Sequence, residues 1–161
     1  MKNPFDPGRD PDRHAIWETL MRRDLDAFVE KDWARVERDF DPDRFEGITA
    51  GGSPNPRDWR LTYPTLESYR DDWLKEADDF LKMPLRNGSP RELIWKMSSL
   101  DEIEIQGDRA LCHKKFVANE ALADGRQYAV CCQTLYRMHR VRGEWKIAGF
   151  VGYLPLGMAP V

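Results

Sequence analysis

The sequence of 161 residues has no long apolar run, few cysteines and almost no net charge. No stretch approaches the 18 or so apolar residues that a membrane-spanning helix needs, so we expect no span. The 25 basic and 28 acidic residues nearly cancel, and the missing basic field argues against nucleic-acid binding. The first residues lack the apolar segment of a signal peptide, which predicts a cytoplasmic protein.

The three cysteines, Cys112, Cys131 and Cys132, do not form the pattern of a disulfide framework, because their number is odd and two are adjacent. Cys131 and Cys132 lie in a strand-like pattern, where neighbouring side chains point to opposite faces, so we expect no metal site. The chain also lacks a phosphate-binding loop and a dinucleotide-binding glycine pattern, and we therefore expect no cofactor.

The length suits a single domain, since a chain near 150 residues buries about 70% of its unfolded surface. Residues 1–9 contain proline and glycine without periodicity and predict a flexible arm, followed by one domain over residues 10–161. Asp10 and Pro11 suit the start of a helix. Its apolar stripe, with three- and four-residue steps, comprises Ile16, Trp17, Leu20, Met21, Leu25 and Phe28.

Two or three further helices are expected before residue 82, separated by a long loop over residues 49–64. Asp32 and Thr65 are the residues expected to cap two of them. From about residue 93 to residue 154 the pattern changes to four strands joined by glycine-containing turns. Helices followed by an antiparallel meander predict an α+β fold, with the helices packed on one face of a bent sheet.

A two-residue turn at Arg142-Gly143 assigns an inner face to the last two strands. That face is mostly apolar and comprises Cys132, Thr134, Tyr136, Met138, Trp145, Ile147, Gly149, Val151 and Tyr153. The other face is charged, yet Leu135, Phe150 and Leu154 lie among its charges. Because a simple solvated face does not need them, we expect a homodimer through this outer face.

The same count through a two-residue turn at Asp124-Gly125 pairs His113 with Tyr136 and Lys115 with Thr134 on the inner face. Side chains of such partners have Cβ atoms about 5 Å apart, so His113 and Tyr136 could contact one bound oxygen.

Continuing the count through Gly107-Asp108 would place Ile103 and Ile105 on the outer face and two glutamates inside. That arrangement is unfavourable, so a bulge or a longer turn must change the register at some point. The face that His113 occupies therefore stays open.

Three segments carry a family resemblance: Lys31-Asp32-Trp33 with Phe40, Ile105 to Leu111, and Arg140 to Ile147. In order and spacing, over residues 12–154, the chain resembles the NTF2-like superfamily and its SnoaL-like branch. The resemblance implies a cone, in which a curved sheet wraps against helices around an apolar pocket, often in a homodimer. That superfamily contains ketosteroid isomerase, scytalone dehydratase, limonene epoxide hydrolase, polyketide cyclases and non-catalytic binders, so the fold does not decide the function.

Acid–base side chains inside an apolar cone acquire displaced pKa values, which suits them to proton transfer near neutral pH. We expect His113 to be the proton-transfer group and Tyr136 to hold a substrate oxygen, unless both are core residues. Asp24 is expected to be solvated beside the first helix's stripe, and the isomerase pattern of a helical Tyr with two inward aspartates is absent. The residues expected to bind an apolar ligand are Trp17, Tyr69, Trp73, Lys115, Tyr128, Thr134 and Trp145.

Two interpretations remain at this point. One is a cofactor-free dehydratase, isomerase or cyclase that acts on an apolar carbonyl or polycyclic substrate. The other is a non-catalytic module of the same fold that binds a ligand or a protein. A cavity of about 300 Å³ or more with convergent ionisable groups would favour the enzyme, and a filled core would favour the module.

Overall fold

A computed structural model describes residues 1–156 of the chain. Its helical elements are α1 (Pro11–Trp17), η1 (Glu18–Arg23), α2 (Asp24–Glu30), α3 (Trp33–Val36), η2 (Glu37–Asp39), η3 (Pro56–Asp58), α4 (Leu66–Leu81) and α5 (Pro90–Met97). Its strands are β1 (Glu46–Thr49), β2 (Arg60–Tyr63), β3 (Ser98–Gln106), β4 (Arg109–Ala121), β5 (Gln127–Val141) and β6 (Glu144–Pro155).

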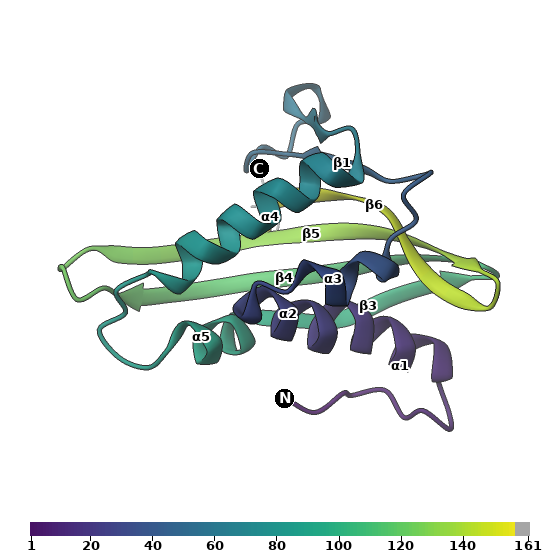
Figure 1. Ribbon diagram of the computed structural model, residues 1–161, viewed down its shortest axis with the longest axis horizontal. Coiled ribbons are helices and arrows are strands. Elements are labelled where there is room, and N and C mark those ends of the chain that lie inside the picture. Colours follow the sequence, from purple (N-terminus) through teal and green to yellow (C-terminus); the bar gives the residue numbers. More distant parts are fainter. Residues whose placement is uncertain (157–161) are drawn as a thin grey trace.

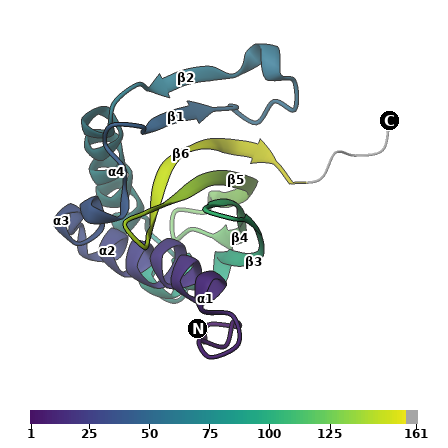
Figure 2. The same ribbon diagram turned by 90° about the vertical axis from the view of Figure 1, so that its right-hand side faces the viewer.

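The strands form one curved, unclosed sheet in the order β2-β1-β6-β5-β4-β3, and the helices cover its concave face (Figures 1 and 2). This architecture confirms the predicted α+β cone. One feature differs from the expected antiparallel sheet, because β1 runs parallel to β6 and makes the sheet mixed. The core lies between the helices and the concave face of the sheet.

The first helix begins where the sequence predicts. The side chain of Asp10 accepts a hydrogen bond from the backbone N–H of Arg13, and Pro11 occupies the first turn. Within the described residues the helix continues through a π-helical segment, η1, into α2, and ends at Lys31 in the left-handed conformation. The expected stripe is buried, with Ile16 and Leu20 at most 1% exposed.

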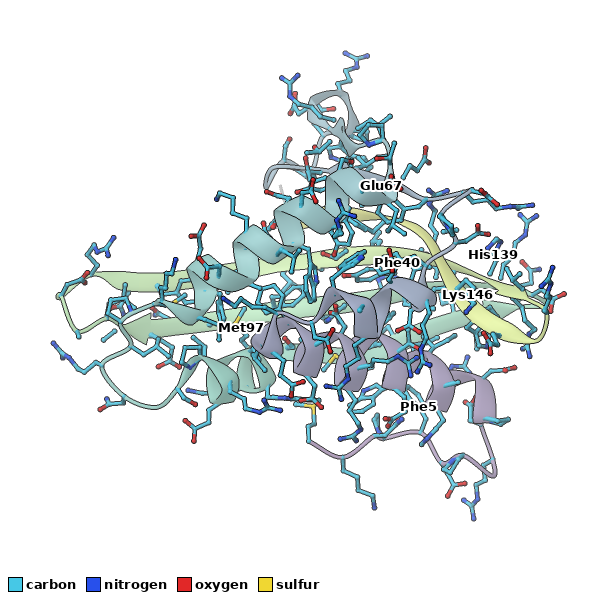
Figure 3. The ribbon with its side chains drawn as sticks, viewed as in Figure 1. Phe5, Phe40, Glu67, Met97, His139 and Lys146 are labelled. Carbon is cyan, nitrogen blue, oxygen red and sulfur yellow. The ribbon has the colours of Figure 1, made fainter. Side chains whose placement is uncertain are left out.

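The arm over residues 1–9 contacts this helix. Asn3 donates hydrogen bonds to the carbonyl of His14 and to Glu18, and Phe5 packs against the core (Figure 3). The flexibility of the arm stays a prediction.

The segment before β3 is a helix, which corrects the strand expected from residue 93. Ser89 and Glu92 form a capping box and Pro90 takes the first turn, so three local signals start a helix at this point. Leu93, Ile94 and Met97 then form its buried face. The strand begins only at Ser98.

The expected loop over residues 49–64 contains most of an edge hairpin, β1 and β2, and this corrects the loop assignment. Each strand has four residues, too few for a clear alternation. Gly47 permits the close pairing, since a Cβ at this position would come within 2.7 Å of Tyr63 and 2.9 Å of Phe150.

The β5–β6 hairpin confirms the turn at Arg142-Gly143 and the predicted pairing as far as Met138 with Ile147. A bulge follows, and it shifts the register by one residue. Tyr136 therefore pairs with Phe150 rather than with Gly149, and Phe150 lies inside the cone instead of on the outer face.

The β4–β5 hairpin has a three-residue loop, Ala123 to Gly125, closed by a hydrogen bond from Leu122 N–H to the Arg126 carbonyl. The expected loop had two residues. An odd count reverses the faces of β4, because the side-chain period of a strand is two. Thr134 consequently pairs with Lys114, and not with Lys115.

The same shift resolves the conflict in the sequence pattern. Ile103 pairs with Cys112 and Ile105 with Ala110, so these apolar residues face the core as their chemistry requires. Tyr136 pairs with Cys112, and the predicted pairing of Tyr136 with His113 is wrong.

Candidate functional site

A cavity of about 420 Å³ lies between the helices and the concave face of the sheet. Helices α2, α4 and α5 and strands β4, β5 and β6 contribute most of its wall. It occupies the half of the cone nearer the β4–β5 hairpin, where Met97 lies, away from His139 and Lys146 at the opposite end (Figure 3). The apolar part of its lining is Leu25, Phe28, Trp73, Phe80, Met83, Ile94, Met97, Phe116, Val130 and Phe150.

All five tyrosines of the chain line this cavity. They come from four different elements and are Tyr63, Tyr69, Tyr128, Tyr136 and Tyr153. A tyrosine combines an apolar ring with a hydroxyl that seeks a hydrogen bond, so this lining is apolar in area but carries several polar atoms.

The structure brings five of the nine expected site residues to the cavity: Tyr69, Trp73, Tyr128, Thr134 and Tyr136. The tryptophans Trp17 and Trp145 are buried elsewhere. The indole N–H of Trp145 donates to Asp12.

His113 and Lys115 lie on the opposite face of β4, outside the lining of the cavity. The ring nitrogens of His113 are 3.8 Å from Glu102 and 3.5 Å from Glu104, and Lys115 forms an ion pair with Glu102. The face of His113, which the sequence left open, is therefore the outer one, and the position counted for Lys115 on the inner face is wrong; the cause is the three-residue loop at the β4–β5 hairpin.

Lys114 points into the cone, whereas the count through a two-residue turn predicts that its neighbours His113 and Lys115 do so. Its side chain is 1% exposed. The ammonium donates to the carboxylate of Asp24 at 2.7 Å and to the backbone carbonyl of Leu20 at 2.6 Å. Leu20 belongs to η1, a wider helical turn of the kind that often occurs at functional sites.

Asp24 is therefore a residue that the sequence argument misplaced. It lines the cavity with its side chain 24% exposed, whereas it was expected to be solvated beside the apolar stripe. A signal was present in the spacing, because Leu20, Asp24 and Phe28 are four residues apart and share one helix face. No comparable signal marked Lys114, which is 90 residues away in the chain.

The hydroxyls of Tyr69 and Tyr136 lie in the part of the site near this ion pair. Burial raises the pKa of Tyr136 strongly, and the negative charge of Asp24 raises it further. Burial likewise raises the pKa of Tyr69 well above its usual value. Both side chains therefore stay protonated and can donate to an oxygen atom of a ligand.

The exposed lining residues Glu76, Asp79 and Tyr153 mark the mouth of the cavity. Tyr153 donates to the Glu76 carboxylate at 2.5 Å. Removal of water by the surrounding protein raises the pKa of Glu76, and this hydrogen bond partly offsets the rise. The mouth thus combines carboxylates with aromatic rings.

Within residues 1–156 no group of three or more His, Cys, Asp or Glu side chains is arranged to hold a metal ion. No helix of this part of the chain is both long and apolar enough to cross a membrane.

Neither a protein-family model nor a curated protein sequence matches the chain. Solved structures do match it. An NTF2-like protein of unknown function from Shewanella baltica OS155 superposes with a TM-score of 0.54 at 13% identity, over 89% of this chain and 94% of the other.

Two further structures have a cystatin-like fold. An NTF2-like protein from Novosphingobium aromaticivorans has a TM-score of 0.54 at 13% identity, over 92% of this chain and 84% of the other. A domain of unknown function from Nostoc punctiforme PCC 73102 has a TM-score of 0.58 at 15% identity, over 92% and 80%. The chain therefore has the NTF2-like fold, and at these identities the likeness concerns the fold alone.

Proposed function

We propose that the protein binds an apolar, ring-containing small molecule with a carbonyl or hydroxyl oxygen in the cavity between its helices and sheet. The observation that carries this proposal is the lining itself. A volume of about 420 Å³ lies within the range of small-molecule sites, and its wall is largely aromatic with a few converging polar groups. A cone that served only as a structural module would fill this space with side chains.

Three hydrogen-bond donors at the inner end of the cavity are suited to bind an oxygen atom of the ligand. Tyr69 and Tyr136 are protonated hydroxyls beside the cavity. Lys114 has three donor hydrogens, of which Asp24 and the Leu20 carbonyl accept two. A ligand oxygen that received these hydrogen bonds would be held in one orientation.

The binding experiment uses 2-acetylnaphthalene and 2-isopropylnaphthalene, which share a ring system but differ in the carbonyl. We expect saturable binding of both by titration calorimetry, with the ketone bound more tightly. Tyr136→Phe should remove most of that preference, since a hydrogen bond contributes about 1 kcal/mol. His113→Ala, outside the cavity, is the control and should retain it. Absence of saturable binding of either compound would contradict the proposal.

The same geometry supports proton transfer without a cofactor, the chemistry of a dehydratase, isomerase or cyclase. Asp24 provides a carboxylate that lines the cavity, and Tyr136 provides a hydroxyl near it. In this proposal Asp24 accepts the proton from a carbon next to the carbonyl, and the electron pair moves to the carbonyl oxygen, which Tyr136 stabilises. The role expected of His113 thus passes to Asp24.

Hydrogen–deuterium exchange tests this step without knowledge of the natural substrate. In D₂O, the methyl protons of 2-acetylnaphthalene should exchange faster with the protein than without it, as followed by NMR. Asp24→Asn should abolish the acceleration, and Lys115→Met should retain it. Binding without accelerated exchange would identify a non-catalytic ligand-binding module, the alternative function.

Self-association through the outer face of the sheet remains part of the proposal, in the changed form that the register requires. Phe150 no longer contributes and Leu154 is already buried within the chain, whereas Leu135 pairs with Val151 and stays partly exposed. Leu135→Arg should convert a dimer into a monomer in light scattering. A wild-type monomer at micromolar concentration would contradict it. Assignment to the SnoaL-like branch rests on the sequence motifs and stays part of the proposal, as does a cytoplasmic location.

A further inference from the structure

The charged groups of the cavity are unequally neutralised. Its lining contains the carboxylates of Asp24, Glu76 and Asp79 and a single cation, Lys114. Lys114 neutralises Asp24, and Asp79 pairs with Lys75 at 2.9 Å. Among the described residues, no lysine, arginine or histidine nitrogen lies within ion-pair distance of Glu76, whose hydrogen-bond partner is the Tyr153 hydroxyl.

A second carboxylate strengthens the negative potential at this point. Asp72 lies one helical turn before Glu76 on α4, and it accepts a hydrogen bond from the Tyr63 hydroxyl. Its charge raises the pKa of Glu76 further, whereas the charge of Lys75, which forms its ion pair with Asp79, lowers that pKa. The mouth of the cavity therefore has a net negative charge beside two tyrosines.

The wall behind this mouth is suited to a cation as well. Ten aromatic side chains line the cavity: Phe28, Tyr63, Tyr69, Trp73, Phe80, Phe116, Tyr128, Tyr136, Phe150 and Tyr153. The faces of such rings carry negative potential and attract cations. The protein already uses one of them in this way, because the Lys114 ammonium lies 5.4 Å from the centroid of Phe116.

We infer that the ligand is an apolar organic cation, a ring system that carries a protonated or quaternary amine and places this group near Glu76. The inference rests on the proposed function, since it names the class of molecule that the same cavity takes. A carboxylate or phosphate would meet the unneutralised charge of Glu76 instead, and Lys114 offers an anion little because Asp24 already balances it. A neutral ring would fill the cavity but gain nothing at its mouth.

Phenyltrimethylammonium and tert-butylbenzene test this inference, because they have nearly the same shape and differ in one charge. Titration calorimetry with the wild-type protein should give a dissociation constant about tenfold lower for the cation, in the range expected of cation–aromatic and ion-pair contacts together. The anion 4-tert-butylbenzoate should bind more weakly than either. Equal or tighter binding of tert-butylbenzene would overturn the inference.

Glu76→Gln removes the charge and nearly preserves the shape of the side chain. It should weaken binding of phenyltrimethylammonium about three- to fivefold and leave tert-butylbenzene unchanged, since Glu76 is exposed at the mouth and its charge is partly screened. Asp78→Asn is the matched control: Asp78 lies on the same helix, outside the lining, and pairs with Lys31 and Lys82. It should leave the binding of both probes unchanged.

The outcomes separate the two proposals. If tert-butylbenzene binds and the cation is not preferred, the proposal that the cavity is a small-molecule site stands and the inference that its ligand is a cation is overturned. An equal loss of cation binding in Glu76→Gln and Asp78→Asn would also overturn it, because the effect would then come from general charge on α4. Failure of every probe, together with failure of 2-acetylnaphthalene, would contradict the proposed function itself.

Discussion

Substitution of Lys114 by methionine tests whether the ion pair under the cavity stabilises the fold. Methionine retains most of the volume and removes the charge, so the change isolates the electrostatic contribution. Without Lys114 the Asp24 carboxylate loses its cation and the Leu20 carbonyl loses its donor. Loss of one partner from a buried pair costs about 3–5 kcal/mol, and the 24% exposure of Asp24 places this case near 3 kcal/mol.

Urea denaturation followed by tryptophan fluorescence measures this free energy of unfolding. Lys115→Met is the matched control, because Lys115 is the next residue, on the opposite face, in an ion pair with a half-exposed Glu102. We expect it to change the stability by about 0.5 kcal/mol or less. Asp24→Leu completes a double-mutant cycle. The sum of the losses in free energy of unfolding in the two single variants should exceed the loss in the double variant by about 2 kcal/mol or more. A Lys114→Met variant as stable as Lys115→Met would refute this account of the ion pair.

Three further predictions follow from the placement of individual side chains. His113→Ala should leave binding of 2-acetylnaphthalene unchanged and alter stability by about 1 kcal/mol at most, as calorimetry and urea denaturation would measure. Gly149→Ala should destabilise by more than about 2 kcal/mol in urea denaturation, because a Cβ there would lie 2.3 Å from the carbonyl of Glu46 and φ is +146°. At pH 8 iodoacetamide should label the exposed Cys131 and spare Cys112, whose pKa burial raises to about 12, until urea unfolds the protein; mass spectrometry would locate the label.

The parts of the fold that the sequence predicts correctly are those with local signals. Asp10 and Pro11 define a helix start within one turn of chain, and Arg142-Gly143 defines a hairpin within four residues. Each signal depends on backbone chemistry that neighbouring residues decide. The helix at Ser89 has a comparable capping box, but the apolar residues after it also suit a strand, so the sequence pattern does not distinguish the two.

The composition of the candidate site depends on contacts between residues far apart in the chain, and no local sequence signal predicts these contacts. Asp124-Gly125 suits both a two-residue and a three-residue loop, and the difference decides whether His113 or Lys114 enters the cone. General burial preferences favour His113, since a lysine is almost never fully buried without a partner. The partner, Asp24, lies 90 residues earlier in the chain, so its proximity emerges only from the packed structure.

Whether the sequence predicts the face of a strand residue correctly depends on how many turns lie between that residue and the turn at Arg142-Gly143. Tyr128, Thr134 and Tyr136 lie on β5 and have the same parity, so the single turn at Arg142-Gly143 assigns them all to the inner face. The bulge beside Arg137 shifts the partner strand and leaves β5 itself unaffected, so the count from the turn predicts the face of Tyr136 correctly and that of Phe150 wrongly. Residues of β4 require a second turn, and its three-residue loop reversed every one of them. A lysine and a carboxylate at the polar end of a tyrosine-lined cavity are therefore a consequence of loop parity as much as of residue type.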